Sequence, residues 1–118
     1  MANPLCHFEI MTGDPDKCKD FYGSVFEWGY DNATLPGYSL VDAGCEPTGG
    51  IFKKPDVAPG PCANIYFQVD DIDATLKKVE EAGGTVIVPN TEIPGVGHFG
   101  MFTDPEGIAV GVMQPSGS

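Results

Sequence analysis

The feature that most constrains this chain is an internal repeat. Residues 5–10 and 65–69 are short segments in which apolar and polar side chains alternate, and each is followed by aspartate and a stretch with helical spacing. Further along, Leu35–Gly37 is echoed by Ile93–Gly95 at almost the same offset. Such a repeat is typical of two copies of one supersecondary unit packed together. We therefore expect a cavity between the two copies. We expect the functional side chains to be those that each copy directs into this cavity.

The first copy predicts a strand, then a helix, then further strands. Residues 5–11 alternate as a half-buried strand does. Asp14 followed by Pro15 is a strong helix start, because aspartate caps a helix and proline fits its first turn. Strands are predicted at 38–41 and 49–53. The helix has an apolar stripe that we expect to join the core together with Trp28. The stripe consists of Cys18, Phe21, Tyr22, Val25 and Phe26.

The second copy predicts the same order of elements. A strand at 63–69 is followed by a helix that Asp70 or Asp71 caps and that stops at Gly83 and Gly84. Three further segments are strand-like, and Asp104–Gly107 is a turn between the last two. These segments are 85–89, 98–103 and 108–113.

The order β-α-β-β-β, read twice, predicts an α+β fold. We expect two tandem βαβββ modules whose mixed, largely antiparallel sheet curls around a cavity. A chain of 118 residues is one domain, 1–118. Within it we assign module one to 1–58 and module two to 62–115, joined by a proline-rich linker at 54–61.

Composition excludes several partners. The chain has 17 Asp and Glu against 6 Lys and Arg, a net charge of -11. Binding to nucleic acid or to an anionic membrane needs clustered cations, so we expect neither. No apolar run approaches the roughly 20 residues of a membrane span. The four cysteines form no CxxC pair, and no signal peptide is recognised, so we expect a cytoplasmic protein with free thiols.

Strand alternation selects the candidate site residues. If His7 faces the cavity, so do Glu9 on the same strand and Tyr66 and Gln68 on its counterpart. Large apolar side chains then face the helices: Phe8, Ile10, Phe67 and Val69. His7 titrates near neutrality and is a candidate general base, and Glu9 is a candidate acid, base or partner for a cationic group. The alternative is a buried polar network without any ligand.

Motifs spread along the chain resemble a known superfamily. They are FYGSVFEW at 21–28, GGIF at 49–52, VDDID at 69–73 and FTDPEG at 102–107. Together they are similar to the vicinal oxygen chelate superfamily, which includes glyoxalase I, bleomycin-resistance proteins, fosfomycin-modifying enzymes and extradiol dioxygenases. The small glyoxalase-related branch is the most similar.

The resemblance implies positions for a metal site. Carried over to this chain, the ligand positions of the metal enzymes fall on His7, Tyr66, Gly111 and near Ile51. Only His7 among them is a good ligand, whereas a catalytic metal needs about three from the protein. We therefore expect no cofactor. A divalent metal at an atypical site, with His7 joined by Glu9 or His98, is the alternative.

Three functions remain open. The first is a metal-free protein of the bleomycin-resistance kind that binds a small polar or aromatic molecule in the cavity, with Tyr66, Gln68, Gly111 and Met113 as ligand-binding residues. The second is an enzyme, a lyase or isomerase similar to lactoylglutathione lyase or a dioxygenase, with His7 and Glu9 as catalytic residues. The third is a non-catalytic structural or partner-binding domain. By the same resemblance we expect a homodimer.

Overall fold

The computed structural model describes residues 2–44, 47–55 and 60–115. It divides into two compact units: an N-terminal unit of residues 7–64, and a C-terminal unit in which residues 1–6 join residues 65–118. The start of the chain is tied to the C-terminal unit by a hydrogen bond of 2.9 Å, in which the Gln68 N–H donates to the Pro4 carbonyl. The boundary between the units therefore runs through a strand at each end of the N-terminal unit.

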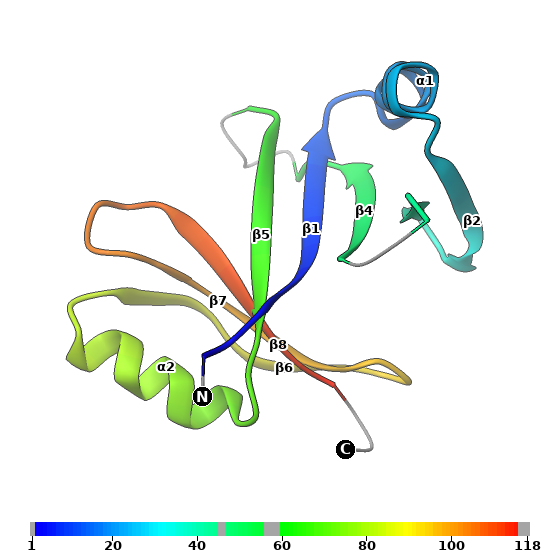
Figure 1. The fold of residues 1–118 in the computed structure, drawn as a ribbon. Helices are drawn as coiled ribbons and strands as arrows, with labels where there is room; N and C mark the ends of the chain where they lie inside the picture. The colour runs from blue at the N-terminus through cyan, green and yellow to red at the C-terminus, as the bar shows by residue number, and fades with distance from the viewer. Residues whose placement is uncertain (1, 45–46, 56–59, 116–118) are drawn as a thin grey trace. The chain divides into compact units, whose positions relative to one another are not determined.

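The N-terminal unit contains one helix and a four-stranded sheet (Figure 1). Strand β1 runs parallel to β4, while β4 with β3 and β3 with β2 are antiparallel, which gives the order β2-β3-β4-β1. The predicted elements are all present. Their bounds are β1 Leu5–Thr12, α1 Pro15–Phe26, β2 Gly29–Leu35, β3 Tyr38–Asp42 and β4 Thr48–Lys53.

The C-terminal unit repeats this topology. Its first strand, β5, runs parallel to β8, and β8, β7 and β6 follow in antiparallel order. The βαβββ order therefore occurs twice, and the predicted α+β fold is confirmed. The bounds are β5 Cys62–Gln68, α2 Ile72–Glu81, β6 Thr85–Ile93, β7 Gly97–Thr103 and β8 Ala109–Pro115.

Two strands differ from the sequence-based bounds. Strand β2 was not recognised, because Gly29 and Asn32 interrupt any alternation there. Strand β6 continues past Pro89, which lacks a backbone N–H. Proline is tolerated there because β6 is the last strand in the order, and its pairing register shifts between Val88 and Thr91.

Both helices begin at the predicted caps. The Asp14 carboxylate accepts from the Lys17 N–H, and the Asp71 carboxylate accepts from the Ala74 N–H, each at 3.1 Å. These bonds satisfy backbone donors that a first helical turn leaves open. In the described part of the chain, neither helix has the length and apolar character needed to cross a membrane.

The helices attach to their sheets in different ways. Helix α2 buries Ile72 and Leu76 in an apolar cluster with Val69 and Val112. Helix α1 has no fully buried residue. Its stripe was expected to join the core, and for three members this is wrong, since their side chains are more than half exposed: Phe21, Val25 and Phe26.

The contacts of α1 explain that difference. The aromatic side chains at the end of α1 stack on one another and on Trp28, which in turn meets Phe8 of β1 at 5.6 Å between ring centroids. Hydrogen bonds from Lys19 and Tyr30 add to this attachment. Tyr30 donates its hydroxyl hydrogen to the Lys19 carbonyl at 2.9 Å, and the Lys19 ammonium donates to Ser39 at 3.1 Å.

Candidate functional site

His7 is the centre of a polar cluster in the N-terminal unit. It lies on β1 with only 8% of its surface exposed. The strand register places it opposite Thr48 of β4, and its Nδ1 lies 2.7 Å from the Thr48 hydroxyl oxygen. Its Nε2 lies 2.7 Å from the hydroxyl oxygen of Tyr38 on β3. Side chains from two other strands, β4 and β3, thus hold this imidazole through both of its nitrogens.

The cluster continues from Tyr38 to Glu9. The Tyr38 hydroxyl donates to Glu9 Oε2 at 2.9 Å. Glu9 lies two residues beyond His7 on β1, so both side chains leave the same face of the sheet. The structure therefore brings the two predicted catalytic residues together through one tyrosine, in the order Thr48, His7, Tyr38 and Glu9, which we call the polar chain.

Two adjacent glycines of β4 make room for this arrangement. The Tyr38 ring lies directly over Gly50, and the Phe8 ring lies over Gly49 on the opposite face. A Cβ at either position would lie well inside 3.0 Å of the ring, a separation that real Cβ atoms do not tolerate. Ile51, near which the resemblance placed a metal-ligand position, is fully buried in the core. The β4 residue that pairs with His7 is Thr48, not Ile51.

Burial governs the charge of His7. Desolvation lowers the pKa of the imidazole, and the nearby Glu9 carboxylate opposes this to a smaller extent by attracting a proton. The imidazole is therefore held toward its neutral form. A neutral imidazole donates from one ring nitrogen and accepts at the other, as its two partners require.

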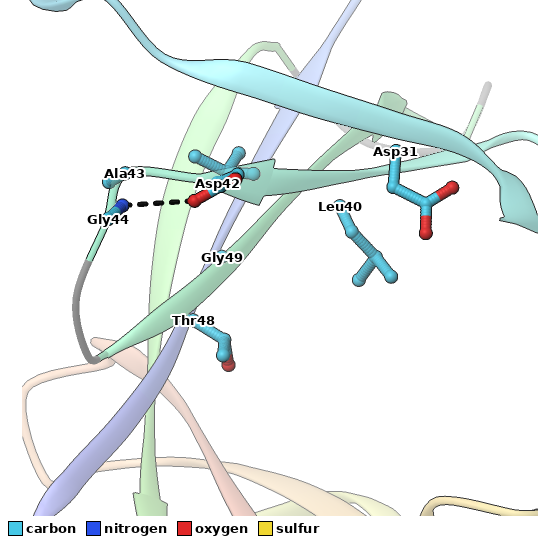
Figure 2. Close-up of a pocket in the computed structure, with 8 residues that line it drawn as sticks. Asp31, Leu40, Asp42, Ala43, Gly44, Thr48 and Gly49 are labelled. Carbon is cyan, nitrogen blue, oxygen red and sulfur yellow. Dashed lines mark hydrogen bonds between the residues drawn. The ribbon is translucent and has the colours of Figure 1, made fainter.

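An open pocket of about 470 Å³ lies beside the polar chain (Figure 2). Thr48 belongs to both, because its side chain contacts His7 and lines the pocket. Figure 2 shows the side chains of Asp31, Leu40 and Thr48 directed to the same open side. The full lining is Asp31, Leu40, Val41, Asp42, Ala43, Gly44, Thr48 and Gly49.

The two pocket carboxylates are fixed by local hydrogen bonds. The Thr34 hydroxyl and the backbone N–H groups of Ala33 and Thr34 donate to Asp31 and lower the pKa of its carboxyl group. The Gly44 N–H donates to Asp42 at 3.1 Å. Both carboxylates therefore have backbone donors that hold their orientation.

The four predicted ligand-binding residues lie on β5 and β8 of the C-terminal unit. Tyr66 is paired with Gly111, and Gln68 with Met113. The Tyr66 ring lies over Gly111 as Tyr38 lies over Gly50, and its hydroxyl reaches the Met101 sulfur at 3.8 Å. Tyr66 is buried, whereas Gln68 is exposed. The space above Gly111 is thus filled by an aromatic ring of the same unit.

His98 belongs to a separate polar cluster in the C-terminal unit. Its Nδ1 lies 2.9 Å from Asn90 Oδ1, and the Asn90 amide donates to Asp73 at 3.3 Å. Within residues 2–44, 47–55 and 60–115, no three His, Cys, Asp or Glu side chains are grouped so that they could hold a metal ion.

Comparison with known proteins agrees with the repeated βαβββ topology. The family model described as the Glyoxalase/Bleomycin resistance protein/Dioxygenase superfamily matches residues 5–112. The chain belongs to this superfamily. The match includes both copies of the βαβββ unit, so the superfamily assignment applies to the whole repeat and not to one half of it.

Curated relatives and a solved structure add detail to this superfamily assignment. The chain is 39% identical over 113 residues to "Putative glyoxylase CFP32" of Mycobacterium tuberculosis, and 28% identical over 125 residues to the anthracycline biosynthesis protein DnrV of Streptomyces peucetius. These matches include 90% and 91% of this chain but 43% and 45% of the relatives, so it spans less than half of their length. Hypothetical protein BH1468 from Bacillus halodurans shares the fold, with a TM-score of 0.75, 15% identity, and coverage of 100% and 98% of the two chains.

Sequence reasoning missed Tyr38 and Thr48 as site residues. Alternation along β1 placed His7 and Glu9 on one face, but the residues opposite them depend on the cross-strand register. Adjacent glycines in a strand, as at Gly49–Gly50, are a signal of close approach, and here the groups that approach are the rings of Phe8 and Tyr38.

Proposed function

We propose that this superfamily member binds a small polar organic molecule without a metal, on the face of the N-terminal sheet that carries His7 and Glu9. The observation that supports this most is the polar chain, in which Thr48, His7, Tyr38 and Glu9 are joined by hydrogen bonds of 2.7, 2.7 and 2.9 Å. These bonds fix the side chains before a ligand arrives, which lowers the entropic cost of binding. The adjoining pocket provides space for the ligand.

The donor set at His7 does not suit a metal. A metal ligand needs a free lone pair on an imidazole nitrogen. Here Nδ1 is within 2.7 Å of Thr48, and Nε2 is within 2.7 Å of Tyr38. Binding an ion would require one of these bonds to break, so no step of the proposed function is assigned to a metal.

Ligand screening by protein-observed NMR tests the proposal. We expect saturable binding of at least one compound in a panel of small polar and aromatic metabolites. Glu9→Gln and Tyr38→Phe should weaken it about tenfold each, the size of one charge-assisted hydrogen bond. Glu80→Gln, on the exposed surface of α2, is the matched control and should leave the affinity unchanged. A panel in which no compound binds would refute the proposal.

A second candidate is acid–base catalysis at a carbon next to a carbonyl group. The observation that favours it is that the Tyr38 hydroxyl links His7 to the Glu9 carboxylate, so that Glu9 can take a proton from a substrate while the chain adjusts its hydrogen bonds. The similarity to "Putative glyoxylase CFP32" also supports this candidate.

Hydrogen exchange in deuterium oxide distinguishes this second candidate from binding alone. The substrate would be the hemithioacetal of methylglyoxal and glutathione, and the readout is deuterium in the product. Turnover that is lost in Glu9→Gln but kept in Glu80→Gln would support catalysis. Binding without turnover or exchange would leave binding as the function.

A further inference from the structure

We propose that helix α1 carries an interface through which two copies of this chain form a symmetric dimer. The surface consists of Phe21, Tyr22, Val25 and Phe26, which we call the aromatic patch. Three of these side chains, Phe21, Val25 and Phe26, are 58%, 53% and 57% exposed. The patch shares no residue with the polar chain or with the pocket, so this proposal is independent of the proposed function.

The aromatic patch is one continuous apolar surface. Tyr22 joins the two phenylalanines, because its ring centroid lies 5.1 Å from that of Phe21 and 6.1 Å from that of Phe26. Val25 lies one helical turn beyond Phe21, so both side chains leave the same side of the helix. Aromatic side chains are enriched, and charged ones depleted, at the centre of protein–protein interfaces. The patch therefore has the composition of an interface centre.

Polar contacts on the other side of α1 fix the outward direction of the patch. The Lys19 ammonium donates at 3.1 Å to Ser39, which is buried on β3. Gly23 also faces inward, because a Cβ there would lie 3.6 Å from the ring of Tyr30. Rotating the helix to bury the patch would turn Lys19 away from Ser39. The exposure of the patch thus follows from the way in which α1 attaches to its sheet.

Helix α2 holds the equivalent place in the second copy of the repeat and has no such patch. Its apolar residues Ile72 and Leu76 are 0% and 7% exposed, and they pack with Val69 and Val112. All residues of α2 are described, and none of them is an exposed large apolar side chain. Exposed apolar surface is therefore not a general property of the βαβββ unit in this chain, and it points to a role that belongs to α1.

The charges at the two ends of the patch select a second copy as its partner. Lys17 lies one turn before Phe21, Glu27 directly follows Phe26, and both charged residues are exposed. A two-fold axis that passes near Tyr22 makes the two α1 helices antiparallel and places Lys17 of one copy level with Glu27 of the other, because each is five residues from the axis. The helix dipoles attract in the same arrangement. A parallel pair would place like charges together.

The size of the patch predicts a weak dimer. Two phenylalanines and a valine, each slightly more than half exposed, present roughly 300 Å² of apolar surface per copy. A standard interface buries about 800 Å² per partner, so neighbouring polar side chains would have to form its rim. The net charge of -11 on each copy opposes association. We therefore expect an equilibrium between monomer and dimer that depends on protein concentration.

Sedimentation velocity of the full chain at about 150 mM salt measures this equilibrium, with protein from about 10 µM to 1 mM. We expect a dimer fraction that rises over this range. Phe21→Ser combined with Val25→Ser should raise the dimer Kd about a hundredfold or more, because both copies lose apolar surface. Ile87→Ser combined with Ile108→Ser removes two side chains of similar exposure, 50% and 59%, and should leave the Kd unchanged.

Two results of this experiment would overturn the proposal. The first is a chain that stays monomeric at about 1 mM, which would exclude a second copy as the occupant of the patch. The second is a dimer whose Kd is the same in the wild type and in the Phe21→Ser, Val25→Ser variant, since the interface would then lie elsewhere. Circular dichroism shows whether each variant is folded.

Exchange of charges between copies tests the antiparallel pairing without changing the patch. Lys17→Glu and Glu27→Lys should each raise the Kd roughly tenfold, because each replaces two attractive pairs by two repulsive ones. An equimolar mixture of the two variants should form a mixed dimer with an affinity near that of the wild type, because opposite charges then face each other at both positions. Lys78→Glu, an exposed residue of α2, is the control for Lys17→Glu.

Both charge variants preserve α1. Glutamate is favourable in the first turn of a helix, and Glu27→Lys keeps a Cβ at the φ of 60° that ends α1. Repulsion between whole chains predicts a different result, because Glu27→Lys makes the net charge less negative and would tighten association. Tighter association of this variant, or a mixture that associates no better than the variants alone, would overturn the proposal.

Discussion

Replacing Gly50 by alanine tests how the polar chain is built. The new methyl group would point into the Tyr38 ring, whose atoms lie well inside 3.0 Å of the Cβ position. Carbon atoms pack at about 3.5–4.0 Å, so the ring has to move by roughly 1 Å or more. A displacement of this size lengthens the bonds of 2.7 and 2.9 Å that Tyr38 makes with His7 and Glu9 beyond hydrogen-bonding range.

The expected cost has two parts. Adding a methylene-sized group to a well-packed region costs about 1–3 kcal/mol. Each lost hydrogen bond adds about 1 kcal/mol, because His7 is buried and Glu9 is only half-buried. We therefore expect Gly50→Ala to lower the free energy of unfolding by about 3–5 kcal/mol, a large share of the roughly 5–15 kcal/mol of a typical domain.

Urea denaturation followed by circular dichroism measures this change. Gly13→Ala is the control, because nothing lies within 4 Å of its Cβ position. In a Tyr38→Ala background the ring is absent, so Gly50→Ala should then cost little, and a double-mutant cycle isolates the contact. If Gly50→Ala unfolds at the same urea concentration as Gly13→Ala, the packing of Tyr38 on Gly50 is refuted.

Three further predictions concern other parts of the chain. Glu27→Gly should raise the free energy of unfolding by about 0.5–1 kcal/mol in thermal denaturation, because Glu27 ends α1 at a φ of 60°, which strains a residue with a Cβ; a lower stability would contradict this. The pKa of His7 is lower in the folded state, so the unfolded state binds more protons and stability should decrease as the pH falls below about 6.5; denaturation of His7→Gln should show a shallower decrease between about pH 7 and 5. Asp71→Ala should cost about 1 kcal/mol through loss of the α2 cap, while Asp70→Ala, beside it, should cost much less; equal losses in urea would argue against the cap.

Much of the fold was predictable because its signals are local. Asp14 and Asp71 cap helices through contacts within a few residues, and alternation along β1 correctly places His7 and Glu9 on one face. These patterns depend only on the periods of helices and strands. They define the elements and their faces without any knowledge of which strands are neighbours.

The partners of His7 were not predictable because they depend on strand register. Tyr38 and Thr48 are 31 and 41 residues from His7 in the chain, and a shift by one residue would turn both away. The position near Ile51 illustrates this sensitivity, since Ile51 is buried in the core while Thr48 faces His7. The exposed stripe of α1 was missed for a related reason, because periodicity shows that a face is apolar but not what covers it.

The grouping of the first six residues with the C-terminal unit has a consequence for dividing this protein. A second copy expressed alone, from Pro61 onward, would lack the Pro4 carbonyl that accepts from Gln68. Although the sequence repeats, the bounds of each repeat therefore differ by a few residues from those of the compact unit. A cut between Gly60 and Pro61 would remove residues 61–64 from the N-terminal unit and residues 1–6 from the C-terminal unit, and the second fragment could recover the Pro4 carbonyl only from the first.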